Sequence, residues 1–121
     1  MIDIAERIRA YTIANCGNRL RLCGPYLYEH LGLLRKAADR RCHKQVGMSA
    51  VAYMWRIQAE LARDLLLGTN LKMYSVAEGV GYAGETTSQT VSLCRMYPRH
   101  FGISPGSQPR FINIPSYMRK T

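Results

Sequence analysis

The sequence lacks the features that mark a membrane or a secreted protein. No apolar run approaches the ~18 residues that a membrane-spanning helix needs. The N-terminus shows no basic start, apolar stretch and small-residue cleavage site, so we expect no secretory signal and predict a cytoplasmic protein. Cysteine occurs at only 4 positions, and none of them forms a CxxC pair. We interpret these cysteines as reduced thiols and not as a disulfide framework.

Catalytic and metal-binding patterns are also missing. None of the 3 histidines stands in a Ser–His–Asp or Cys–His arrangement, so we predict no enzyme activity. Cys42 and His43, taken with Cys16 and Cys23, match no zinc-ligand spacing. We therefore predict no metal and no cofactor, and a metal or redox sensor is the least favoured hypothesis.

Acidic residues are scarce. The chain has 8 Asp and Glu against 17 Lys and Arg, which gives a formal net charge of +9 on 121 residues. Such an excess favours a polyanionic partner, either nucleic acid or an anionic membrane surface; a merely soluble basic protein is the alternative. Apolar residues make up 47% of the chain, which is enough for a core. The length fits one domain, or two small ones that share a core, without a separate sensor domain.

The apolar spacing predicts an all-α chain, because residues three and four apart recur and no strand-like alternation is sustained. Ser49 is the expected N-cap of the longest helix. Pro98 is expected to end or kink the last helix, since proline cannot donate a backbone hydrogen bond. The segment 83–90 reads as a loop or a helix start. Helices are predicted over 3–14, 25–32, 34–45, 50–67, 73–80 and 91–97.

An internal repeat surrounds the longest helix. A short helix ends at Gly32 and a second helix at Gly47, and the same order recurs at Gly81 and Gly102. An arginine precedes each closing glycine at the same spacing, at Arg40 and Arg95. A short helix, a glycine turn and a second helix form the helix-turn-helix pattern, whose second helix reads the DNA major groove. Two such units could read successive grooves, about 34 Å apart. A helical bundle with a chance repeat is the alternative.

Three stretches, residues 47–67, 73–82 and 101–105, resemble the AraC/XylS family of bacterial transcription regulators. The resemblance implies two helix-turn-helix subdomains joined by a long linker helix. It implies duplex DNA as the partner, binding as a monomer, and RNA polymerase as a further partner of an activator. No membrane is implied. The implied DNA-binding domain is 1–105, with a first subdomain at 1–47, a linker helix at 49–67, a second subdomain at 70–105 and an irregular tail at 106–121.

The resemblance also implies which residues of the first reading helix, 34–44, face DNA. These are Lys36, Asp39 and Arg40. Arginine pairs with both guanine O6 and N7, lysine reaches a guanine or a phosphate, and aspartate can only accept from a cytosine amino group.

The second reading helix is expected at about 89–97, with Gln89, Thr90, Val91 and Arg95 facing the bases. Glutamine suits adenine, valine a thymine methyl group, and arginine guanine. Phosphate contacts are expected from residues at helix starts, which set the register without reading sequence. The phosphate candidates are Arg35, Ser49 and Lys72.

Several residues depart from the family pattern. Large apolar residues are usual at the positions of Ala38, Arg41 and Cys42, and a small residue is usual at Tyr28, as at Ala77 in the second unit. The loop after Tyr82 is longer than usual, Pro98 falls in the second reading helix, and Gly106 begins a segment that replaces an aromatic helix. These departures motivate a second hypothesis, a protein-interaction module that has lost DNA binding.

Overall fold

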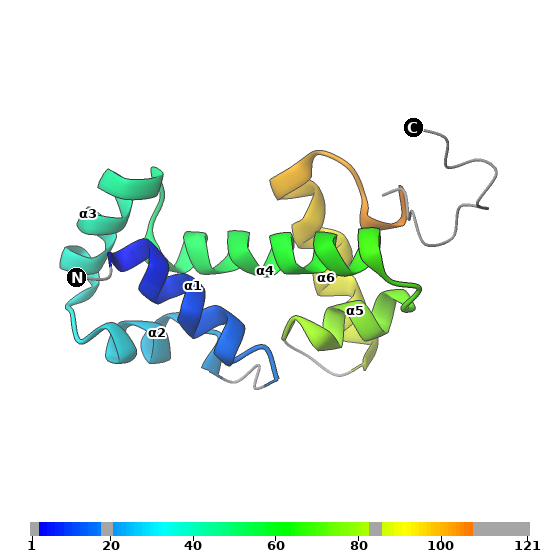
Figure 1. The fold of residues 1–121 in the computed structure, drawn as a ribbon, viewed down its shortest axis with the longest axis horizontal. Helices are drawn as coiled ribbons and strands as arrows, with labels where there is room; N and C mark the ends of the chain where they lie inside the picture. The colour runs from blue at the N-terminus through cyan, green and yellow to red at the C-terminus, as the bar shows by residue number, and fades with distance from the viewer. Residues whose placement is uncertain (1–2, 18–20, 83–85, 108–121) are drawn as a thin grey trace. The chain divides into compact units, whose positions relative to one another are not determined.

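The computed structural model describes residues 3–17, 21–82 and 86–107, with the backbone alone at 86–89. These residues form helices and no strand, so the predicted all-α class is confirmed. None of the described helices is both long and apolar enough to cross a membrane. The elements, drawn in Figure 1, are α1 (Ile4–Ala14), α2 (Gly24–Leu31), α3 (Arg35–Val46), α4 (Ala50–Gly68), α5 (Met73–Gly79), α6 (Thr86–Phe101) and the 3₁₀ turn η2 (Pro105–Ser107).

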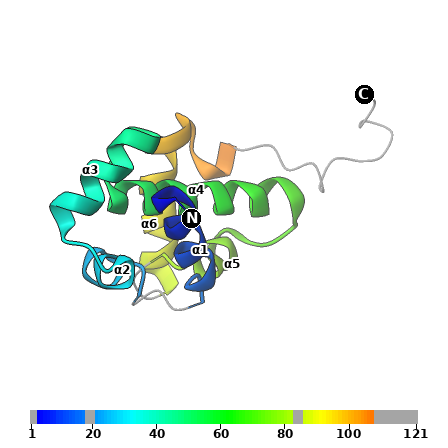
Figure 2. The same ribbon diagram turned by 60° about the vertical axis from the view of Figure 1, so that its left-hand side comes forward.

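The chain divides into two compact units, unit 1 (Met1–Gln58) and unit 2 (Ala59–Thr121), which meet within α4. In unit 1, α1 packs against both α2 and α3. Asp3 caps α1 by accepting a hydrogen bond of 2.8 Å from the Glu6 N–H, and Ile8 is fully buried. Figure 2 shows the same helices in a second view, with α3 at an edge of unit 1 in both views.

The start of α4 confirms the predicted cap. The Ser49 hydroxyl oxygen accepts a hydrogen bond of 3.2 Å from the Ala52 N–H, which satisfies one of the donors left open at a helix start. Within unit 1, Met54 and Ile57 of α4 are fully buried. Burial of this apolar side of the helix gives α4 its place in the core.

Unit 2 has an apolar core of its own. The α5 and α6 helices pack together, and the last turns of α4 complete the cluster. The Arg63 guanidinium lies over the Phe101 ring, 4.5 Å from its centroid, and so covers one side of this core. The buried members are Ala62, Leu66, Val76, Ala77, Val80, Tyr82, Leu93 and Tyr97.

The four glycines of the internal repeat have a positive φ. The other glycines that the structure describes do not. The φ angles are 67° at Gly32, 77° at Gly47, 82° at Gly81 and 76° at Gly102. Side chains rarely adopt this left-handed conformation, which ends helices. Each helix of the repeat is therefore followed by a glycine in the left-handed conformation, which directly caps α2 and α3 and lies one residue beyond the cap of α5.

Pro98 does not end α6. The helix continues to Phe101, and the Pro98 carbonyl accepts a hydrogen bond of 2.8 Å from the Gly102 N–H. Proline removes one helical bond and crowds the preceding turn. Leu93 and Tyr97 are fully buried, and Phe101 packs against the same cluster. Apolar packing on both sides of the proline thus outweighs the lost bond. The prediction that Pro98 ends this helix was wrong, and the alternative, that it kinks the helix, stays a prediction.

Candidate nucleic-acid interface

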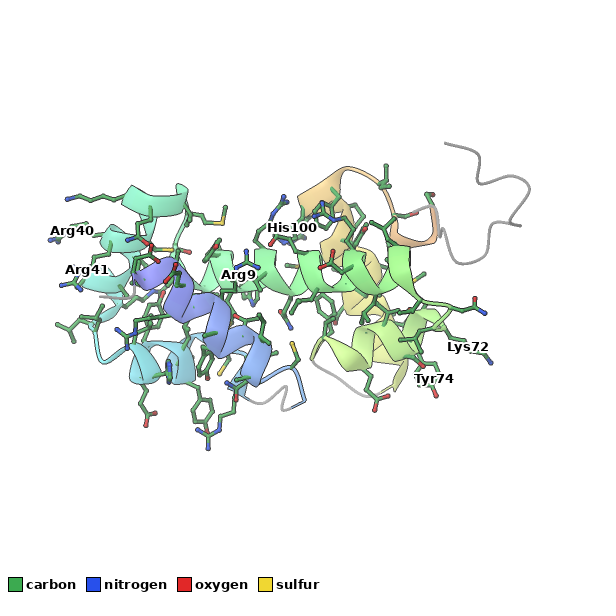
Figure 3. The ribbon with its side chains drawn as sticks, viewed as in Figure 1. Arg9, Arg40, Arg41, Lys72, Tyr74 and His100 are labelled. Atoms are coloured by element: carbon green, nitrogen blue, oxygen red, sulfur yellow. The ribbon has the colours of Figure 1, made fainter. Side chains whose placement is uncertain are left out.

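The α3 helix presents a row of cations on one side and packs with the other. Lys36, Arg40 and Lys44 are exposed and follow one another at intervals of one helical turn. Ala38 and Cys42, on the opposite side, are fully buried. The small side chains at these two departures from the family pattern thus fill core positions. Figure 3 shows Arg40 with its neighbour Arg41, which is also exposed, pointing outward from α3.

The α6 helix has the same division. Val91 is 45% exposed, and Arg95 and Arg99 follow it at helical spacing as exposed residues. Leu93 and Tyr97 are fully buried on the other side. The predicted reading helix therefore starts earlier than expected, at Thr86, and has an open cationic face.

The repeat brings the two helices into one register. When Gly47 is aligned with Gly102, three exposed residues of α3 fall on exposed residues of α6, and both buried residues of α3 fall on buried ones. The other exposed residues of α3, such as Arg41, fall on half-buried residues of α6, such as Met96. A chance similarity of glycine turns would not match the exposed and buried faces as well. The exposed pairs are Lys36 with Val91, Arg40 with Arg95 and Lys44 with Arg99; the buried pairs are Ala38 with Leu93 and Cys42 with Tyr97.

Two cations of these rows were missed from the sequence. Lys44 and Arg99 each lie one turn beyond the arginine that the repeat singled out. The signal was present, because residues four apart share a helix face. Lys44 is the last residue of the predicted first reading helix, and Arg99 lies beyond the predicted end of the second helix at 97.

A groove beside the α3 row adds further positive charge. It has a volume of about 650 Å³ and is lined by Arg7, Arg41 and Lys44, among others. The Arg7 guanidinium donates to the carbonyls of His30 and Leu31, at 3.3 and 3.2 Å, and so stabilises the carboxyl end of α2. Arg41 therefore lines a cationic groove, at a position where the family pattern has a core residue.

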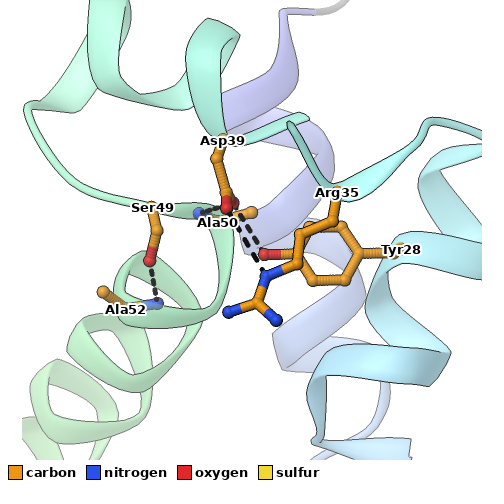
Figure 4. A network of polar contacts seen from close by, with 6 residues as sticks. All are labelled: Tyr28, Arg35, Asp39, Ser49, Ala50 and Ala52. Atoms are coloured by element: carbon orange, nitrogen blue, oxygen red, sulfur yellow. Dashed lines mark hydrogen bonds and ion pairs between the residues drawn. The ribbon is translucent and has the colours of Figure 1, made fainter. Parts of the chain in front are cut away.

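Asp39 has partners within its own unit. Its Oδ1 atom accepts hydrogen bonds from the Tyr28 hydroxyl at 2.6 Å and from the Ala50 N–H at 3.1 Å. Its Oδ2 atom lies 3.8 Å from Arg35 Nε (Figure 4). The Asp39 carboxylate, which was predicted to face a cytosine, thus contacts two neighbouring helices. We do not include it among the base contacts proposed below.

The contact with Asp39 also affects the pKa of the Tyr28 hydroxyl. Burial, together with the hydrogen bond to Asp39, raises the pKa of Tyr28 to about 12. The ring is half-buried between the helices where the family pattern has a small residue. Its hydroxyl keeps its proton and donates it to Asp39, so a bulky residue is accommodated through a polar contact.

The remaining site residues are placed as follows. Arg35 is 80% exposed in its side chain, and Lys72 is exposed at the N-cap of α5 (Figure 3). Ser49 and Thr90 are half-buried. Gln89 lies on α6, and its side chain is outside the described part of the chain.

Metal ligands do not gather in the part of the chain that the structure describes: no three His, Cys, Asp or Glu side chains lie close enough to hold an ion. Burial raises the pKa of the fully buried Cys42 thiol to about 11. This thiol packs as an apolar side chain and is neither a ligand nor a nucleophile at neutral pH.

Two helix-turn-helix units, each with an open cationic second helix, define the class of DNA-binding transcription regulators. The chain belongs to the helix-turn-helix domain family of the AraC type, whose pattern matches residues 27–108. Among solved structures it is similar to the C-terminal domain of AraT, a response regulator from Geobacillus stearothermophilus. The two are 26% identical with a TM-score of 0.69, over 94% of this chain and 89% of that one. No curated protein matches the chain.

Proposed function

We propose that the chain is a sequence-specific transcription regulator that inserts α3 and α6 into successive major grooves of duplex DNA. The observation that carries this proposal is the shared register of the two exposed cationic rows. A helix with one buried side and one open basic side is the form that enters a major groove. Because one chain carries two such helices, a monomer on an asymmetric site suffices.

The base contacts follow from the chemistry of the exposed side chains. Arg40 and Arg95 pair with guanine, each through two hydrogen bonds, and Lys36 reaches a guanine or a phosphate. Val91 contacts a thymine methyl group. Gln89 and Thr90 are proposed to contact bases from the first turns of α6, with adenine as the partner of the glutamine.

The phosphate contacts surround these base contacts. Ser49 and Lys72 stand at helix starts, and Arg35 begins α3. The three further cations that the sequence did not single out extend the same surfaces, since they lie beside or beyond the reading arginines. Phosphate contacts hold the register while base contacts choose the sequence. The added phosphate candidates are Arg41, Lys44 and Arg99.

Activation of transcription through contact with RNA polymerase, in the bacterial cytoplasm, completes the proposal. It is supported by the resemblance to the small AraC/XylS regulators. A reporter gene placed behind a selected binding site tests the sign of regulation: expression should rise when the chain is present, and a fall would identify a repressor.

The decisive test combines site selection with two substitutions. Binding sites are first selected from random duplex DNA. Arg40→Ala and Arg95→Ala should each cost about 1–3 kcal/mol of binding free energy and relax the preference at a different base pair. Arg21→Ala, which removes an exposed cation that lies over the Tyr26 ring, is the matched control and should leave the preference unchanged. Full affinity and specificity in both reading variants would overturn the assignment.

The interaction-module hypothesis stays the alternative, and four of the departures that motivated it are accommodated within the helices. Ala38 and Cys42 fill the core, Arg41 is exposed, and α6 continues through Pro98. None of these departures disrupts a reading helix. Failure to bind duplex DNA even at low salt, together with capture of RNA polymerase, would support that hypothesis.

A further inference from the structure

Asp39 joins three helices of unit 1 through one carboxylate. It belongs to α3, accepts from Tyr28 of α2, and accepts from the first amide of α4, at Ala50. That amide is one of the N–H groups that a helix start leaves without an intrahelical partner. Hydrogen bonds to a charged acceptor are stronger than those between neutral groups. The carboxylate thus ties the reading helix to both elements that flank it.

The second unit lacks all three members of this network. Aligning Gly32 with Gly81 places Ala77 at the position of Tyr28. Aligning Gly47 with Gly102 places Cys94 at the position of Asp39 and Pro105 at that of Ala50. Alanine has no hydroxyl, and proline has no backbone N–H. All three members of the network are therefore replaced in unit 2.

The two units hold their reading helices in different ways. In unit 2, Ala77 is fully buried and packs in one apolar cluster with Leu93 and Tyr97 of α6. In unit 1, the equivalent α3 positions hold Ala38 and Cys42, which bury less apolar surface than leucine and tyrosine. In unit 1 the polar network therefore accompanies smaller buried side chains on α3 than those on α6.

We propose that Asp39 is a positioning residue for DNA reading by unit 1. It acts through Tyr28 and Ala50 to fix how α3 presents Lys36 and Arg40, and it does not contact a base. Its Oδ2 atom also lies 3.8 Å from Arg35 Nε. This inference rests on the proposed function, and it predicts that the bases read by unit 1 depend on a residue that touches none of them.

The test compares four variants on the selected site. Tyr28→Phe and Asp39→Ala should each weaken binding roughly three- to tenfold, as expected for the loss of one or two buried hydrogen bonds. The double variant should be little worse than either, because both changes break one network. Asp39→Asn should restore most of the affinity, since its amide oxygen can still accept both bonds. Tyr26→Phe, an exposed tyrosine of the same helix, is the matched control.

The position on the DNA at which the base preference relaxes separates a positioning role from a general loss of folding. The base pairs that Arg40→Ala identifies should lose preference in Tyr28→Phe and Asp39→Ala. The base pairs that Arg95→Ala identifies should keep theirs. Because α6 belongs to unit 2, a general loss of the folded chain would affect both halves of the site alike.

Three outcomes overturn the proposal. A new preferred base at one position in Asp39→Asn would show that Asp39 reads a base directly. Equal relaxation in both halves of the site, or unchanged binding in Tyr28→Phe, would show that the network does not orient α3. If the wild-type chain binds no duplex DNA, the proposed function fails, and the role of Asp39 fails with it. This outcome differs from the first two, in which the wild-type chain still binds DNA.

Discussion

The pKa of Tyr28 reflects the burial of its hydroxyl first and the contact with Asp39 second. A tyrosine hydroxyl ordinarily has a pKa of about 10, and here the pKa is raised to about 12. Because the folded state favours the neutral hydroxyl, the contact stabilises the fold fully below about pH 10. That stabilisation is lost as the pH rises through about 12.

We therefore expect the advantage of the wild-type chain over Tyr28→Phe to shrink between pH 10 and 12. The loss should be about 1–2 kcal/mol of unfolding free energy, less than the full shift would give, because the half-buried ring is partly screened by solvent. Urea unfolding of both proteins at pH 9 and pH 12 measures it. A constant difference would contradict the contact, as would a tyrosinate absorbance that differs between the proteins only near pH 10.

The cysteines of the two reading helices should differ in reactivity. Cys42 of α3 is fully buried with a raised pKa, whereas Cys94 of α6 is exposed. A thiol-specific reagent at pH 7.5 should label Cys94 at least about tenfold faster, because Cys42 is buried and its raised pKa keeps it protonated. Denaturant should abolish the difference. Mass spectrometry of the labelled peptides checks this, and early labelling of Cys42 would place α3 differently.

At the scale of single elements, Gly47 and Gly102 set where the two reading helices end. Gly47→Ala should destabilise the chain by about 1–2 kcal/mol, because a left-handed conformation at a φ of 77° is strained for any residue with a Cβ. Gly68→Ala is the control: that glycine is helical, has no positive φ, and leaves open space for a Cβ. It should be neutral or slightly stabilising. Thermal unfolding compares the two variants; equal effects would contradict the role of the turn.

The same elements show what the sequence could reveal. Apolar spacing and glycine position predicted the helices, because both are local signals of the chain. The continuation of α6 through Pro98 could not be predicted, since it depends on packing of Leu93 and Tyr97 against residues distant in sequence. The contacts of Asp39 were missed for the same reason: its partners Tyr28 and Ala50 come together only in the fold.

At the scale of the whole molecule, the net charge of +9 predicts a steep dependence of DNA binding on salt. If the six cationic phosphate candidates all make contact, the log–log slope of affinity against salt should be about −5. Lys44→Gln should reduce the steepness by about 1 without changing the preferred bases. Gel shifts over a salt series measure both slopes. A slope near zero would assign the charge to another partner. The candidates are Arg35, Lys36, Arg41, Lys44, Lys72 and Arg99.

The polar network of unit 1 also constrains how this sequence can change over generations. Loss of Tyr28 alone leaves a carboxylate with one fewer donor, and loss of Asp39 alone leaves a half-buried hydroxyl and a helix-start amide without their acceptor. Each single step is costly, whereas a joint change removes the hydroxyl donor and its acceptor together, as at the equivalent positions of unit 2, where Ala77 and Cys94 stand. Descendants of this gene should therefore vary the two positions as a pair, and an alignment of its orthologues would show them covarying.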